Sequence, residues 1–215
     1  MHLPPDKWSE SILVVPRTAL ALNWQGLKTT ALAADLARIE QHAEFQPRGL
    51  MEQDENYKQI IPYLIFQYQD QLFLMQRAAQ ASEARLQQRW TLGIGGHLRA
   101  QDLASLTLTK GEERPLAPVT LAQQIFAWAQ REFHEEVSYH GQLQLSFLGL
   151  LNDDSNSVGR VHLGLVLLVQ GDRPEIQIKT ELQQGQLCSI AACREQQSQL
   201  ESWSQIVFER QWAHN

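Results

Sequence analysis

The chain has few cysteines and no excess of positive charge. Cys188 and Cys193 are its two cysteines in 215 residues, too few for a disulfide framework or for a zinc site built from paired C-x-x-C ligands. We expect both to be reduced thiols in a cytoplasmic protein. The formal net charge is −6 and the pI is about 5.6, whereas a surface that binds extended nucleic acid is normally basic. The composition argues against such a partner and leaves small phosphorylated ligands open.

The chain also lacks a long apolar run. Its longest candidate, residues 161–169, falls far short of the ~18 residues that suggest a membrane span. The first residues lack the basic-then-apolar pattern of a signal peptide. We therefore expect no membrane partner. Hydrophobic residues nonetheless make up 43% of the chain, enough for a sizeable core, and the length predicts a single elaborated domain over residues 1–215.

Strands and helices are expected in an irregular order, which predicts the α+β class with a mixed β-sheet between helices. The apolar periodicity predicts strands at residues 12–15, 59–68, 71–76, 90–94, 144–151, 161–170 and 176–178, and helices at residues 29–42, 120–137 and 200–210. Pro62 predicts an edge position or a bulge in its strand. Gln69 and Asp70 predict a hairpin turn. Residues 98–118 predict a long irregular loop.

The clearest helix carries an acidic cluster. Thr120 and Gln123 form a T-x-x-Q capping box at its start, and an apolar stripe follows at helical spacing. Near its end Glu132, Glu135 and Glu136 share one face, where each like-charged pair would weaken the helix by roughly a few tenths of a kcal/mol. A divalent cation would offset this repulsion, because carboxylate oxygens suit Mg²⁺ or Mn²⁺. An acidic solvated surface is the ordinary alternative.

The run from Arg131 to Tyr139 resembles the second half of the Nudix box, G-x5-E-x7-R-E-U-x-E-E-x-G-U, in which U is bulky and apolar. Gly95 and Gly96 resemble the paired glycines of the first half, and Asp102 stands where the box has its first Glu. Arg131 lies 29 residues after Asp102, against 8 in the pattern, so 21 residues are inserted within the box. Ser138 also replaces the final Gly. A longer loop costs little extra closure entropy, so the insertion is compatible with the fold.

The resemblance implies a Nudix fold, an α/β/α sandwich with a core over about residues 56–215, an N-terminal extension over about 1–55 and an inserted loop at 98–118. Residues 58–63, 83–86, 93–97, 161–164 and 201–204 are also similar to a Nudix subgroup described as predicted phosphoesterases. That subgroup brings no assigned substrate. The resemblance also allows a homodimer.

The activity implied is hydrolysis of a phosphoanhydride, in a nucleoside diphosphate linked to another group, by attack of water on phosphorus. Glu132, Glu135, Glu136 and the Gly95 carbonyl would hold Mg²⁺ or Mn²⁺. Arg131 belongs to the catalytic set, either pairing with a box carboxylate or holding a substrate oxygen. The general base would be Glu135 or Glu136, with three distant alternatives at Glu181, Glu195 and Glu201.

The sequence leaves the roles of three further basic residues and two histidines undecided. Lys58, Arg77 and Arg85 lie in or near the strands before the glycines, where they contact either phosphate or solvent. His97 and His134 are more often hydrogen-bonded or solvent-facing than reactive.

Three competing hypotheses remain. A non-catalytic Nudix domain would bind or sense a nucleotide, although it would not need all three carboxylates. An isoprenoid diphosphate isomerase would need a reactive cysteine near the site, whereas the two cysteines come late in the chain. A protein-interaction module with an acidic helix would leave the glycine pair unexplained.

Overall fold

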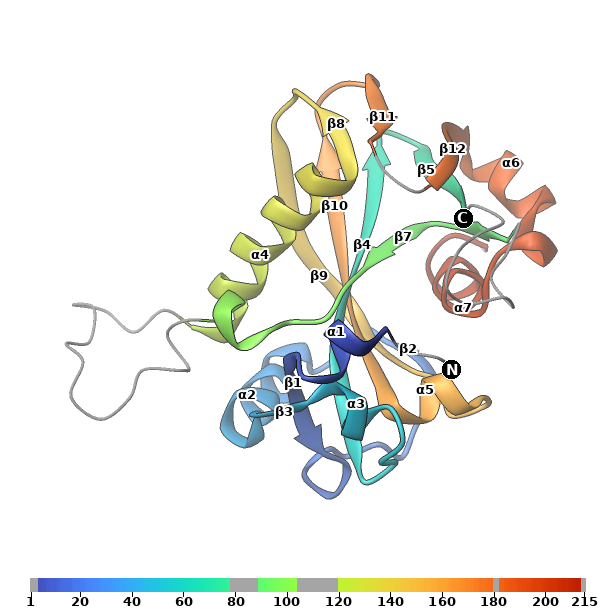
Figure 1. Ribbon diagram of the computed structural model, residues 1–215. Helices are drawn as coiled ribbons and strands as arrows, with labels where there is room; N and C mark the ends of the chain where they lie inside the picture. Colours follow the sequence, from blue (N-terminus) through green and yellow to red (C-terminus); the bar gives the residue numbers. More distant parts are fainter. Residues whose placement is uncertain (1–3, 78–88, 104–119, 180–181, 214–215) are drawn as a thin grey trace.

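A mixed β-sheet forms the centre of the computed structural model, which describes residues 4–77, 89–103, 120–179 and 182–213 (Figure 1). In spatial order its strands are β12 (Leu182–Ser189), β5 (Gln71–Arg77), β4 (Tyr57–Tyr68), β10 (His162–Gly171), β9 (Leu143–Asn152) and β2 (Gly26–Lys28). The pairing of β10 with β4 is parallel and the other pairings along this order are antiparallel.

Further short strands pair beside β4, β5 or β1 in the same sheet. They are β1 (Ser11–Pro16), β3 (Glu44–Pro47), β6 (Trp90–Thr91) and β7 (Gly93–Gly95). β1 pairs with β3 and with the start of β4, while β7 pairs with the middle of β4. The N-terminal segment, which the sequence suggested as an extension, therefore contributes strands to the central sheet, with β2 at its far edge beside β9. A separate two-stranded sheet joins β8 (Val137–Tyr139) to β11 (Ile176–Ile178).

Helices cover both faces of the sheet, as the predicted α/β/α sandwich requires. Figure 1 shows α4 on one side and α7 on the other, with the long strands between them. The helices are α1 (Pro5–Trp8), α2 (Leu32–His42), α3 (Arg48–Met51), α4 (Leu121–Glu136), α5 (Ser157–Val161), α6 (Ile190–Glu195) and α7 (Ser202–Gln211). In the described part of the chain, no helix is both long enough and apolar enough to cross a membrane.

β4 shows why the sheet has two cores. Ile60, Leu64 and Phe66 face the core that includes residues of α2 and α4, whereas Tyr63 and Ile65 face the core that includes residues of α6 and α7. Successive strand residues point to opposite faces, so a strand covered on both sides is apolar at nearly every position. This explains the continuous apolar runs of β4 and β10.

The prediction that Pro62 marks an edge or a bulge is wrong, because β4 is a central strand and Pro62 pairs in register with Leu165 of β10. The carbonyl of Pro62 accepts from Gly96 N–H at 3.4 Å. The N–H and C=O of a strand residue point to the same side, so the missing N–H of Pro62 faces β7 and not β10. That side is where β4 changes partner from β1 to β7, and the ladder to β10 loses no bond.

Most predicted elements are present within a few residues of their expected limits. The predicted strand at 90–94 divides into β6 and β7, and the predicted helices become α2, α4 and α7. The sequence does not predict β12, because the glutamines at 183, 184 and 186 lack the apolar alternation of a half-buried strand. Its backbone still pairs with β5 from Leu182 to Ser189. The predicted irregular loop lies outside the described residues from position 104 to its end.

The capping box of α4 yields a test of its stability. Thr120 Oγ1 accepts from the N–H of Gln123 at 3.3 Å, and Gln123 Oε1 accepts from the N–H of Thr120 at 2.9 Å. Thr120→Ala removes this cap and should lower the free energy of unfolding by about 1 kcal/mol, measured by urea denaturation. Thr120→Ser keeps the hydroxyl and should stay near wild type. Equal losses in the two variants would contradict the capping role.

Candidate active site

The acidic cluster lies on the last two turns of α4, which ends at Glu136 where β8 begins. Trp128, Ala129 and Phe133 of the same helix are buried against the sheet, so the carboxylate face turns away from the core. Glu132 is partly buried, and the side chain of Glu135 is 58% exposed. The helix therefore presents a graded set of carboxylates, from sheltered to solvated.

The glycine half of the box lies against this cluster. Gly95 ends β7, and Gly96 approaches α4 so closely that a Cβ atom there would lie 3.2 Å from Glu132 Oε1 and 3.0 Å from Trp128 Cζ2. A side chain at position 96 would press on both residues. The segments that the resemblance joins across an insertion are thus in contact in the folded chain.

Asp102 links the segment after the glycines to α4. Its side chain is 3% exposed and accepts from Arg131 at 2.5 Å, from the Arg99 N–H at 2.9 Å and from Arg99 Nε at 3.1 Å. Arg131 Nε also lies 3.5 Å from Glu135 Oε1. This geometry suits Arg131 to positioning Glu135, because its guanidinium is already shared between two carboxylates.

The surroundings of Glu132 disfavour the negative charge of its carboxylate. Burial raises the pKa of Glu132, and the neighbouring charges of Glu135 and Glu136 raise it further, against the opposing effect of Arg99 and Arg131. A raised carboxyl pKa means that the folded protein disfavours the ionised form. A divalent cation between the carboxylates would reverse this balance, and the oxygen-only donor set is the kind that Mg²⁺ and Mn²⁺ take.

Lys58 is not available to a phosphate. Its side chain is 0% exposed, and its amine donates to Asp154 at 2.7 Å, to the Gly159 carbonyl at 2.7 Å and to the His162 carbonyl at 3.2 Å. The suggested substrate contact at Lys58 is therefore wrong for this structure. A lysine has three N–H donors, and all three are used inside the protein.

The side chains of the two remaining substrate candidates cannot be placed. Arg85 lies outside the described residues, as does the side chain of Arg77, although Arg77 forms the end of β5. Among the distant base candidates, Glu181 lies outside the described residues and Glu195 is exposed on α6.

Glu201 is held as the N-cap of α7. Its carboxylate accepts from the Ser204 N–H at 2.8 Å, from Ser204 Oγ at 2.6 Å and from Tyr63 Oη at 2.6 Å. A carboxylate with these partners has a structural role, so we do not retain it as a candidate base.

The two cysteines lie away from the acidic helix. Both are buried free thiols in the core that includes residues of α6 and α7. Burial, reinforced by Cys188, raises the pKa of Cys193 to about 12, so this thiol is not ionised near neutral pH. Neither cysteine fits the reactive group that an isoprenoid diphosphate isomerase would need.

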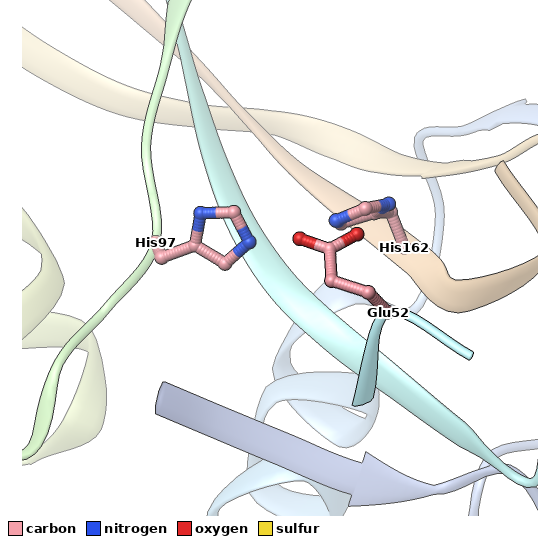
Figure 2. A group of neighbouring side chains, drawn as sticks. All are labelled: Glu52, His97 and His162. Carbon is pink, nitrogen blue, oxygen red and sulfur yellow. The ribbon is translucent and has the colours of Figure 1, made fainter. Parts of the chain in front are cut away.

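His97 belongs to a group that sequence patterns did not reveal. Its Nε2 atom lies 2.8 Å from Gln59 Oε1, which agrees with the expectation of a hydrogen-bonded histidine. Glu52 and His162 lie beside it (Figure 2). Burial lowers the pKa of His97 well below its usual value, with further lowering by His162, Arg48 and Lys7. His134 is exposed, as expected. No local spacing joins Glu52, His97 and His162, because they come from distant parts of the chain.

Comparison with known proteins defines the class. No family model matches the chain. The solved structure of Tm1382, which is assigned to the Nudix hydrolases, is similar with a TM-score of 0.73 and 26% sequence identity, covering 96% of this chain and 100% of Tm1382. The chain belongs to the Nudix superfamily, which confirms the family resemblance and the predicted fold. It is also 31% identical over 216 residues to protein YmaB of Bacillus subtilis (strain 168), covering 94% of this chain and 98% of YmaB.

Proposed function

We propose that this protein is a divalent-metal-dependent hydrolase that cleaves a phosphoanhydride bond in a nucleoside diphosphate linked to another group. The observation that carries the proposal is the close approach of Gly96 to Glu132, where a Cβ atom on Gly96 would lie 3.2 Å from Glu132 Oε1. The similarity to Tm1382 supports the same class of activity.

The residues of this chain suit the parts that such a reaction needs. Glu132, Glu135, Glu136 and the Gly95 carbonyl would hold Mg²⁺ or Mn²⁺. When bound, that ion would neutralise phosphate oxygens and lower the pKa of a coordinated water. Glu135 or Glu136 would accept the proton of the attacking water. Arg131, held by Asp102 at 2.5 Å, would keep Glu135 in place.

The experiment is a substrate panel with the full-length protein. Nucleoside triphosphates, ADP-ribose, dinucleoside polyphosphates and NADH are incubated with Mg²⁺, with Mn²⁺ or with EDTA, and phosphate-containing products are measured. We expect metal-dependent turnover of at least one compound. Glu136→Gln should reduce it by about 100-fold or more, the scale on which a lost base or ligand is felt. Turnover unaffected by this change would reject the proposed site, and tight binding without turnover would favour a nucleotide sensor.

A further inference from the structure

Glu52, His97 and His162 converge from three distant segments. Glu52 follows α3, His97 follows β7 and His162 is the first residue of β10. One ligand atom from each lies within 4.8 Å of the other two. Figure 2 shows the carboxylate of Glu52 between the two imidazole rings, whose centroids are 5.6 Å apart. None of the three belongs to the box carboxylates.

His162 is held in the tautomer that binds a metal ion through Nε2. Its side chain is buried, and Nδ1 lies 2.7 Å from the Val158 carbonyl. A carbonyl only accepts, so Nδ1 carries the proton and Nε2 is the acceptor of the neutral ring. Metal-binding histidines typically have such a partner on the other nitrogen. The backbone register, with His162 opposite Gln59, fixes this ring beside β4.

His97 and Glu52 are also fixed by neighbours. The Gln59 amide donates to the Met51 carbonyl at 3.2 Å, which turns its oxygen towards His97 Nε2. Arg48 Nε lies 3.2 Å from Glu52 Oε1, and the same guanidinium also pairs with Glu10 at 3.0 Å. The charge of Arg48 is thus shared between two carboxylates.

The chain after His97 is anchored as well. The Leu13 N–H donates to the Leu98 carbonyl at 2.8 Å, and Ile12 forms a bridge with Arg99. β1 therefore restrains the backbone on the C-terminal side of His97. Each of the three side chains approaches from a segment that is fixed by contacts of its own.

We propose that Glu52, His97 and His162 form a second cation site that binds a transition-metal ion of the Zn²⁺ class. Imidazole nitrogens suit Zn²⁺ far better than Mg²⁺, whereas the box offers oxygen donors only. Two histidines and one carboxylate are a ligand set that leaves a fourth position open to water or substrate. His97 binds the ion through Nε2 in the tautomer whose proton has moved to Nδ1, and the Gln59 oxygen, 2.8 Å from Nε2, then lies next to the site as an additional neutral donor. The site rests on these residues alone and does not depend on the proposed function.

The test measures Zn²⁺ binding to the metal-stripped full-length protein by isothermal titration calorimetry, with Zn²⁺ as the probe. We expect tight binding of one Zn²⁺ ion per chain, and we expect Glu136→Gln to retain it. His97→Asn and Glu52→Gln should each weaken it by at least about 100-fold, since loss of even an outer partner of a ligand costs about 10–100-fold. His140→Asn, which changes an exposed histidine outside the site, is the matched control and should bind as wild type does.

Co²⁺ gives a second readout that is independent of activity. Wild type and Glu136→Gln loaded with Co²⁺ should show the visible absorption of a low-coordinate nitrogen and oxygen site, and Glu52→Gln should lose it. Circular dichroism identifies a variant that fails to fold, and the near-isosteric Glu52→Gln then carries the test. Absence of a tight Zn²⁺ event, or equal Zn²⁺ binding by wild type and Glu52→Gln, would overturn the proposal. So would loss of the event in Glu136→Gln, which would assign the ion to the box.

Discussion

Replacing Glu132 with glutamine is expected to reduce metal-dependent turnover by about 100-fold or more and to stabilise the metal-free protein. The two effects have one cause. Glu132 is the carboxylate closest to the glycine pair, and its ionised form is disfavoured by burial and by Glu135 and Glu136. Glutamine keeps the shape of the side chain and removes its negative charge. The repulsion from Glu135 and Glu136 is then relieved, and the metal ion loses a charged oxygen ligand.

The measurement is a pair of thermal melts at neutral pH, with EDTA and with excess Mg²⁺, beside the turnover assay. In EDTA the Tm of Glu132→Gln should lie above that of wild type, whereas Mg²⁺ should raise the Tm of wild type more, because a ligand that binds only the native state stabilises it. Glu209→Gln, which changes an exposed residue of α7, is the control and should change neither property. Unchanged turnover, or a lower Tm in EDTA, would contradict the placement of Glu132 in a cation site.

Replacing Asp154 with asparagine is expected to lower the free energy of unfolding at pH 7 by about 3–5 kcal/mol, the cost of breaking a buried ion pair from one side. Asp154 Oδ1 lies 2.7 Å from the amine of Lys58, whose side chain is 0% exposed. Asp154 also accepts from Arg17 and from Gln25. Without the carboxylate, the buried ammonium loses its paired counter-charge and keeps the Gly159 and His162 carbonyls as acceptors.

The pH dependence of this effect has a defined sign. Burial opposes ionisation of Asp154, but its hydrogen bonds with Arg17, Lys58 and Gln25 outweigh it and hold the pKa well below the usual range. A lowered acid pKa contributes stability that is complete above the unfolded value of about 3.9 and is lost as the pH falls below it. Wild type should therefore lose stability below about pH 4 more steeply than Asp154→Asn.

Urea denaturation at pH 7, and at steps down to about pH 2.5, measures both effects. Glu55→Gln is the matched control, because Glu55 pairs with Arg160 on the surface, with side chains 56% and 39% exposed. An exposed pair contributes about 0–1 kcal/mol, so this variant should remain near wild type. A loss in Asp154→Asn no larger than that of the control would show that Lys58 does not depend on its counter-charge.

The local chemistry of the sequence predicted the elements that carry the box. The T-x-x-Q cap and the apolar stripe of α4 follow from contacts between residues three and four positions apart. The Gln69-Asp70 turn likewise predicted the hairpin of β4 and β5, and Gln69 has the positive φ of 52° that such a turn needs. Local patterns failed at β12 and Pro62, where the backbone pairing of distant strands decides the structure.

The three carboxylates on one helix face and the glycine pair after a strand were determined by the sequence alone, because their spacing is local. Tertiary structure alone brought Gly96 close to Glu132 and paired Asp102 with Arg131. It also buried Lys58 against Asp154, which lies 96 positions away in the chain. It also joined Glu52, His97 and His162. The parallel register of β10 on β4 and the anchoring of the chain after β7 on β1 set these distances, and neither leaves a periodic trace in the sequence.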